Sequence, residues 1–222
     1  SCGLWYFDKD GNINIKNNEA LAASFDIIVK MKEAGILYEA ESTEGRAGAL
    51  NNGTVASVVN APWFISSIRQ AEDQKGLWRA ARIPRISTLD SSINASNVGG
   101  SSWYVLENSE VKDDAIAFLQ GVWEGNTDFY DTIMRNQGAM GSYIPAYDTG
   151  VYEEVDEFFG GQKLNGLFAE VLPDVIPVNY GGYVAEANDA ITTALANLFE
   201  GKTDINGALE QAESQLSNQL GR

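Results

Sequence analysis

The chain has 222 residues, of which 44% are hydrophobic and 21% charged, a balance typical of a globular protein long enough to bury a core. Its 31 acidic and 15 basic residues give a net charge of −16, which would repel a phosphate backbone, so we expect no nucleic-acid partner. The chain has no histidine and a single cysteine, which excludes a histidine-based catalytic triad, an internal disulfide and a thiolate metal cage, and we expect no metal and no cofactor.

Two features near the N-terminus each allow two interpretations. Cys2 fits a lipid-modified cysteine, but strand-like and turn-like residues follow at once instead of a polar linker, so we favour a chain that begins within a longer protein. Asp8-Lys9-Asp10-Gly11-Asn12 resembles the start of a calcium loop, but Ile13 stands where that loop needs glycine. We therefore expect a tight turn between two strands here.

The next residues predict helices and strands in alternation. Apolar residues at helical spacing from Leu21 to Val29 predict a helix that ends near Gly35, and a short helix is expected over 46–50. The β-branched run 54–59 predicts a buried strand. Further strands are expected at 79–83 and 103–106.

Helix signals dominate the rest of the chain. Asn60 and Pro62 are expected to open a helix, because asparagine caps well and proline is tolerated in a first turn. Four apolar stripes then predict helices, and they comprise Ala115, Ile116, Leu119 and Val122; Phe129, Ile133 and Met134; Val184, Ala187, Ile191, Leu195 and Leu198; and Ile205, Leu209, Ala212, Leu216 and Leu220. Few strands among many helices predict an α/β fold.

Four carboxylates cluster at Glu153, Glu154, Asp156 and Glu157. A glycosidase needs two carboxylates held at a defined separation across the scissile bond. Adjacent acidic residues are more often a solvated helix face, which is the interpretation we favour.

Aromatic residues are the more informative class, with five Trp, nine Tyr and nine Phe. Trp63 starts a helix directly after a predicted strand, and Trp103 follows the small residues Gly99 to Ser102. Tyr180 and Tyr183 bracket two glycines just before a long helix. Flat side chains at strand–helix junctions suit the apolar C–H faces of sugars, although any one of them could equally be a half-buried core residue.

Several motifs, taken in chain order, resemble the maltose-binding-protein-like family of bacterial extracellular sugar-binding proteins of ABC importers. They are Ala49-Leu50-Asn51-Asn52-Gly53-Thr54-Val55-Ala56 with Val59-Asn60-Ala61-Pro62-Trp63; Gly99-Gly100 with 103–106, Ser109-Glu110-Val111-Lys112-Asp113-Asp114-Ala115 and Phe118-Leu119; Ser142-Tyr143-Ile144-Pro145-Ala146; and Gly201-Lys202-Thr203 with Ala208-Leu209. Each motif is loose, but the ordered set covers nearly the whole chain.

The resemblance implies a periplasmic-binding-protein-like (type II) α/β fold of two lobes, of which this chain lacks most of the first. Residues 1–82 and 148–222 are then expected to form the C-terminal lobe. The segment 83–147 is expected to return to the N-terminal lobe and to include the hinge.

By the same resemblance, the protein binds a sugar between the lobes and delivers it to the permease of an ABC importer, as a monomer and without catalysis. Trp63 would stack on a sugar ring beside Asn60, and Ser102, Trp103, Tyr180 and Tyr183 would line the cleft. The protein would be periplasmic, or extracellular and anchored as a lipoprotein. Two alternatives stay open: a peptide or polyamine ligand, which Glu186 and Asp189 could bind if it is cationic, and a carboxylate-based glycosidase.

Overall fold

The computed structural model describes residues 2–97 and 100–221, and these residues form two compact units. The first unit gathers the described parts of Ser1–Glu39, Pro84–Asn94 and Val175–Arg222. The second gathers the described parts of Ala40–Ile83 and Ala95–Asp174. The expected lobes, 1–82 with 148–222 and 83–147, refer to the complete family fold, and that division stays a prediction.

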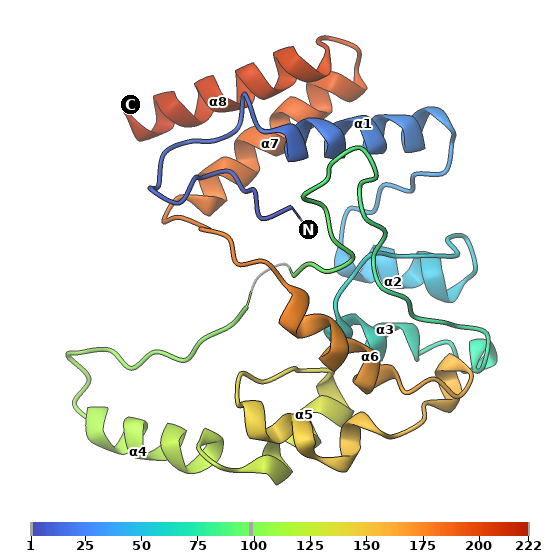
Figure 1. The fold of residues 1–222 in the computed structure, drawn as a ribbon, viewed down its shortest axis with the longest axis vertical. Helices are drawn as coiled ribbons and strands as arrows, with labels where there is room; N and C mark the ends of the chain where they lie inside the picture. The colour runs from blue at the N-terminus through green and yellow to red at the C-terminus, as the bar shows by residue number, and fades with distance from the viewer. Residues whose placement is uncertain (1, 98–99, 222) are drawn as a thin grey trace. The chain divides into compact units, whose positions relative to one another are not determined.

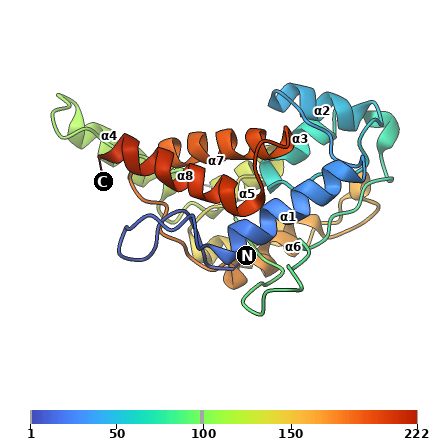
Figure 2. The same cartoon turned by 90° about the horizontal axis from the view of Figure 1, so that it is seen from above.

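Three helices build the first unit: α1 (Glu19–Glu33), α7 (Val184–Phe199) and α8 (Ile205–Leu220). They confirm the helices predicted from apolar spacing in these regions. α7 and α8 lie side by side in both views (Figures 1 and 2), and the alanines at their interface are fully buried, including Ala190 and Ala208. Small side chains at this interface allow close approach of the two helix backbones, while Leu209 and Leu216 supply apolar volume.

The N-terminal segment of the first unit is held by Asn18, which is 2% exposed. Its Oδ1 accepts hydrogen bonds from the N–H groups of Ala20 and Leu21, which caps α1. Its Nδ2 donates to the carbonyl oxygens of Trp5 and Asn14 at 2.9 and 3.0 Å. One side-chain amide therefore joins the start of a helix to the strand-like segment that precedes it.

The second unit is built from short elements. They are α2 (Thr43–Asn51), η1 (Pro62–Phe64), α3 (Ile65–Ile68), η2 (Glu72–Gln74), α4 (Lys112–Trp123), α5 (Thr127–Gln137), η3 (Ile144–Asp148), η4 (Gly150–Tyr152), η5 (Glu157–Phe159), α6 (Leu164–Val171) and η6 (Leu172–Asp174). The helices predicted at 46–50 and after Asn60 are both present, and so are those carrying the stripes that begin at Ala115 and Phe129.

Two buried clusters stabilise this unit. Leu50, Phe64 and Leu164 are each 1% exposed and bring together α2, the turn before α3 and α6. Met134 and Val151 form a second cluster between α5 and the turns that follow it. These clusters fix the positions of α3, the C-terminal end of α5 and the segment 154–158, which surround the cavity described below.

The expected α/β fold is wrong for this structure. Across residues 2–97 and 100–221, the β pairing consists of two isolated bridges, Phe7 with Ile13 and Asp156 with Gln162, and no sheet forms. The predicted strands 54–59, 79–83 and 103–106 form no strand and no bridge. A β-branched or aromatic run becomes a strand only where a neighbouring strand completes its ladder of hydrogen bonds, and the described residues supply none.

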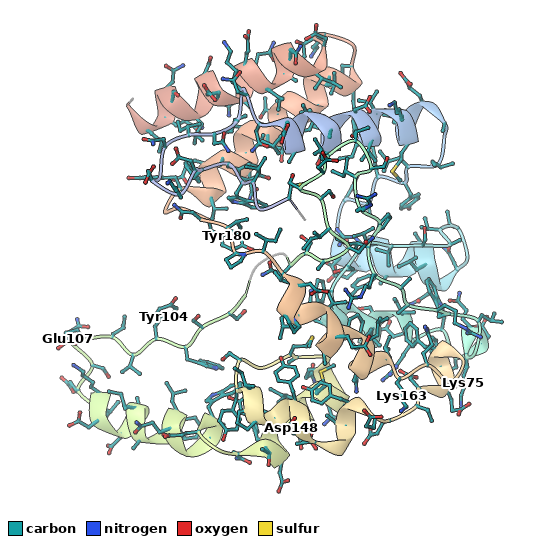
Figure 3. All side chains as sticks on the ribbon, viewed as in Figure 1. Lys75, Tyr104, Glu107, Asp148, Lys163 and Tyr180 are labelled. Atoms are coloured by element: carbon teal, nitrogen blue, oxygen red, sulfur yellow. The ribbon has the colours of Figure 1, made fainter. Side chains whose placement is uncertain are left out.

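α4 differs from the other α-helices of its unit because none of its residues is buried. Phe118 and the preceding Leu106 are 68% and 72% exposed, and Tyr104 projects from the extended segment that leads into the helix (Figure 3). The apolar stripe that predicted this helix is therefore only partly buried. Among the described residues, no helix combines the length and apolar character needed to cross a membrane.

Candidate functional site

Trp63 lies in the turn η1, and its side chain is 48% exposed. Its ring meets the buried Phe64 ring edge-on at 5.4 Å, so the tryptophan rests on the core without being enclosed by it. Ser66 donates a hydrogen bond from Oγ to the Trp63 carbonyl at 3.2 Å. The sequence predicted a partly exposed aromatic at a helix start, and Trp63 has that position.

The turn is positioned by Gly138, the left-handed residue that ends α5. The φ of Gly138 is +61°, and a Cβ on this residue would lie 2.4 Å from the Pro62 carbonyl oxygen. The backbone of the Pro62–Trp63 turn therefore packs directly on the end of α5, which holds the Trp63 backbone in place.

Asn60 does not cap the following helix as predicted. Ala61 occupies the N-cap position without a side-chain bond, and the Asn60 Oδ1 accepts from the Ala61 N–H at 2.8 Å. The Nδ2 of Asn60 is buried and has no hydrogen-bond partner among the described residues. A donor left in this state is costly, so Asn60 is a polar group that a ligand or water would stabilise.

Trp103 and Ser102 lie on the exposed segment before α4. The Trp103 side chain is 70% exposed, and its ring lies 6.2 Å from that of Trp123, which in turn meets Phe129 edge-on at 4.9 Å. Ser102 is exposed. Gly99, the first of the small residues expected to allow close approach, lies outside the described residues.

Tyr180 and Tyr183 belong to the first unit, at the start of α7. Tyr183 is 44% exposed, whereas Tyr180 is half-buried and meets Trp5 edge-on at 5.2 Å (Figure 3 labels Tyr180). The hydroxyl of Tyr180 and the indole N–H of Trp5 are both buried without a hydrogen-bond partner in the described chain. Asn179 fixes this loop, because its Nδ2 donates to the Asp8 carbonyl at 3.0 Å.

The six predicted residues thus belong to three segments of the chain. Trp63 and Asn60 lie before α3, Ser102 and Trp103 before α4, and the two tyrosines in the other unit. Trp63 and Trp103 contact different aromatic neighbours, Phe64 and Trp123. A role for these residues in one site stays a prediction.

Sequence analysis missed a cavity of about 700 Å³ in the second unit, which we name the polar cavity. Helix α3 and the turn η2 form one wall, the C-terminal end of α5 another, and the segment 154–158 a third. Its charged lining consists of Arg69, Glu72, Lys75, Arg135, Glu154, Asp156 and Glu157. Met134 and Phe158 give the same cavity apolar wall, and its volume lies in the usual range for small-molecule sites, about 300–1,000 Å³.

Three of the four clustered carboxylates form ion pairs, and they do not share a helix face as we expected. Arg135 contacts both carboxylate oxygens of Glu154: Nη2 and Nε donate to Oε1 at 2.7 and 3.0 Å, and Nε also donates to Oε2 at 3.3 Å. This hydrogen bonding raises the pKa of the Arg135 guanidinium. Arg69 pairs with Asp156, and Lys163 with Glu153. Arg69 and Arg135 are the sequence signal that could have located the cavity. They lie far in sequence from Asp156 and Glu154, however, so only the tertiary fold shows which carboxylate each arginine binds.

The turn at Asp8 is confirmed as a tight turn. The Asp8 carboxylate accepts from the N–H groups of Asp10 and Asn12 and from the Asn12 side chain, and these bonds lower the pKa of Asp8, the Asn12 side chain contributing most. Over the described part of the chain, no group of three or more acidic or cysteine ligands could hold a metal ion.

Comparison with known proteins identifies a family and a relative. A model of the bacterial extracellular solute-binding protein family matches residues 1–149. A lactose-binding protein from Rhizobium radiobacter is 36% identical over 220 residues, which is 99% of this chain and 52% of the relative. The chain therefore spans about half the length of that relative, and the family match confirms the resemblance found in the sequence motifs. The chain belongs to the bacterial extracellular solute-binding protein family.

Proposed function

We propose that the protein binds an oligosaccharide, with a disaccharide as the smallest ligand, and delivers it to the permease of an ABC importer. The sugar is not altered chemically. The observation that carries the proposal is Trp63, a half-exposed aromatic ring on a fixed turn, in a chain 36% identical to a lactose-binding protein. An aromatic ring held in this way offers a flat surface for the C–H face of a sugar, at low cost in side-chain entropy.

The remaining predicted residues have supporting roles in this proposal. Asn60 would donate from its unpaired Nδ2 to a ligand hydroxyl, and Ser102 beside Trp103 would add a second polar and aromatic contact. Tyr180 and Tyr183 would contribute from the start of α7. The family description supports a location outside the cytoplasm, and we propose a monomer that is periplasmic or anchored as a lipoprotein.

Ligand-detected NMR of the 222-residue chain with lactose tests the proposal, because it registers weak binding. We expect saturation transfer from protein to lactose, and replacement of Trp63 by Ala is expected to weaken binding by about fivefold or more, the scale of a stacked aromatic anchor. Phe118→Ala removes a more exposed aromatic, from α4, and serves as the control. Equal binding by the Trp63→Ala variant, with a lowered melting temperature, would show that Trp63 is structural.

Spermidine and a short peptide are the competing ligands in the same experiment. Transfer to either of these and not to lactose would contradict sugar binding. Incubation with lactose followed by chromatography of the products separates binding from hydrolysis, and we expect the sugar to be recovered intact.

A further inference from the structure

The polar cavity begins at the turn that carries Trp63. Ile65 and Ser66, which follow Trp63 by two and three positions, line the cavity. Gly138 also lines it, and the backbone of Gly138 packs against the Pro62 carbonyl. The cavity and the Trp63 turn therefore share their supporting backbone within one unit. The cavity lining therefore begins two residues after Trp63 in the chain.

Two charge pairs form fixed hydrogen-bonding groups in the cavity wall. One oxygen of Asp156 accepts from the Phe158 N–H at 3.0 Å and the other pairs with Arg69, so this carboxylate, 15% exposed, has a defined orientation. Glu154 is oriented by the hydrogen bonds from Arg135. Each guanidinium keeps N–H donors beyond those used in its pair, because arginine has five.

The charged groups of the wall leave one carboxylate in excess, which disfavours an anion, and both arginines are paired, which suits a neutral ligand. Arg69 and Arg135 each pair with a carboxylate, while the exposed Lys75 (Figure 3) lines the cavity with Glu72 and Glu157. An anion would meet these carboxylates and a cation would meet the guanidinium groups, so either would leave one sign of charge unfavourably placed. A hydroxyl group both donates and accepts, and it can bind either member of a pair.

We propose that the polar cavity is a carbohydrate subsite, in which Arg69–Asp156 and Arg135–Glu154 bind the hydroxyl groups of a neutral sugar whose adjoining ring contacts Trp63. Met134 and Phe158 in the same wall provide apolar surface for the C–H face of the sugar. This inference rests on the proposed sugar-binding function and extends it to residues outside the six predicted from the sequence.

The test measures lactose affinity of the 222-residue chain and of two variants, Arg69→Gln and Arg135→Gln. We expect each variant to bind lactose about tenfold more weakly, on the scale of one lost hydrogen bond to a charged group. Arg82→Gln is the matched control, because Arg82 forms a pair of the same kind with Asp174 at 2.5 Å in the same unit but does not line the cavity. The control is expected to bind lactose as the unaltered chain does.

A double variant, Arg135→Glu with Glu154→Arg, separates a binding role from a structural one. It keeps an ion pair across the same gap, but the hydroxyl groups of a bound sugar have fixed directions, so exchanging the donor and acceptor positions should lower lactose affinity. The melting temperature of this variant reports the effect of a carboxylate placed beside Asp131, which lies 3.7 Å from Arg135. Glucuronate and spermidine are the charged probes, and we expect neither to compete with lactose.

Each outcome decides between the two proposals. Lactose affinities of Arg69→Gln and Arg135→Gln equal to that of Arg82→Gln, with Trp63→Ala still impaired, would overturn the subsite and leave sugar binding at Trp63 intact. Unchanged affinity in the charge-reversed double variant would likewise assign the pair a structural role. A chain that binds no lactose at all would overturn both proposals together.

Discussion

Gly138 and Pro62 are in direct backbone contact, although 76 positions separate them in the sequence, and a Cβ on Gly138 would lie 2.4 Å from the Pro62 carbonyl oxygen. This contact fixes the turn that carries Trp63 to the end of α5. It also places the same turn beside the polar cavity, which Gly138 lines.

Replacing Gly138 by Ala should therefore destabilise the protein through two effects. The left-handed backbone costs a side chain about 1–2 kcal/mol, and the close approach to Pro62 adds a steric penalty. Gly53→Ala is the control, because Gly53 has a φ of +76° and no atom within 4 Å of its Cβ position. Chemical denaturation should show a larger loss for Gly138→Ala, and equal losses would contradict the contact.

Gln162 should contribute to stability by completing the hydrogen bonds of Ala80. Its Oε1 accepts from the Ala80 N–H at 2.8 Å, and its Nε2 donates to the Ala80 carbonyl at 3.0 Å, as a neighbouring strand would. Gln162→Leu keeps similar volume but leaves both half-buried backbone groups unpaired, and we expect a loss of about 1–3 kcal/mol in unfolding free energy. Urea titration measures this loss. Gln120→Leu, on the exposed face of α4, is the control and should change the unfolding free energy little.

Alkaline pH should destabilise the second unit through Tyr152. Burial of the ring, which is 6% exposed, raises the pKa of Tyr152 from 10.0 to about 12. The unfolded chain ionises this tyrosine first, so its contribution to stability is complete below pH 10 and is lost as the pH rises from 10 to about 12. Unfolding midpoints across this range should fall less steeply in Tyr152→Phe than in the unaltered chain or in Tyr104→Phe, whose ring is 84% exposed.

The α7–α8 interface should tolerate little added volume. Ala190 and Ala208 have no exposed surface, so Ala190→Leu would have to separate the helices or force strained rotamers. We expect a loss of about 1–3 kcal/mol, measured by thermal unfolding. Ala185→Leu, at an exposed position of the same helix, should leave the melting temperature nearly unchanged.

Helices were predictable from this sequence because their signals are local. The apolar spacing from Leu21 to Val29 and from Ile205 to Leu220 identified α1 and α8, and Gly35 has the left-handed backbone, with a φ of +66°, of a residue that follows a helix. The strand predicted at 54–59 does not form. A strand needs a second segment of the chain to pair with, and a run of β-branched residues does not show whether such a segment exists.

The candidate site shows the same limit. Trp63 was predictable because a proline and an aromatic residue at a helix start form a local pattern. The polar cavity was not, since Arg135 meets Glu154 across 19 positions and Arg69 meets Asp156 across 87. From the sequence alone, Glu154 and Asp156 are therefore interpreted as solvated acidic residues. Only the fold shows that each forms an ion pair with an arginine.

The Asn18 amide has a consequence for the chemical ageing of the protein. Hydrolysis of this side chain to a carboxylate, as in Asn18→Asp, would keep the two bonds accepted by Oδ1 but lose both donated bonds, because the new oxygen has no proton at neutral pH. That oxygen would then face the carbonyls of Trp5 and Asn14 in a site that is 2% exposed, where repulsion is poorly screened. Replacing one side-chain NH2 group by an oxygen would therefore weaken the link between Trp5 and the start of α1, while Phe7 and Ile15 would still anchor the segment in the core of its unit.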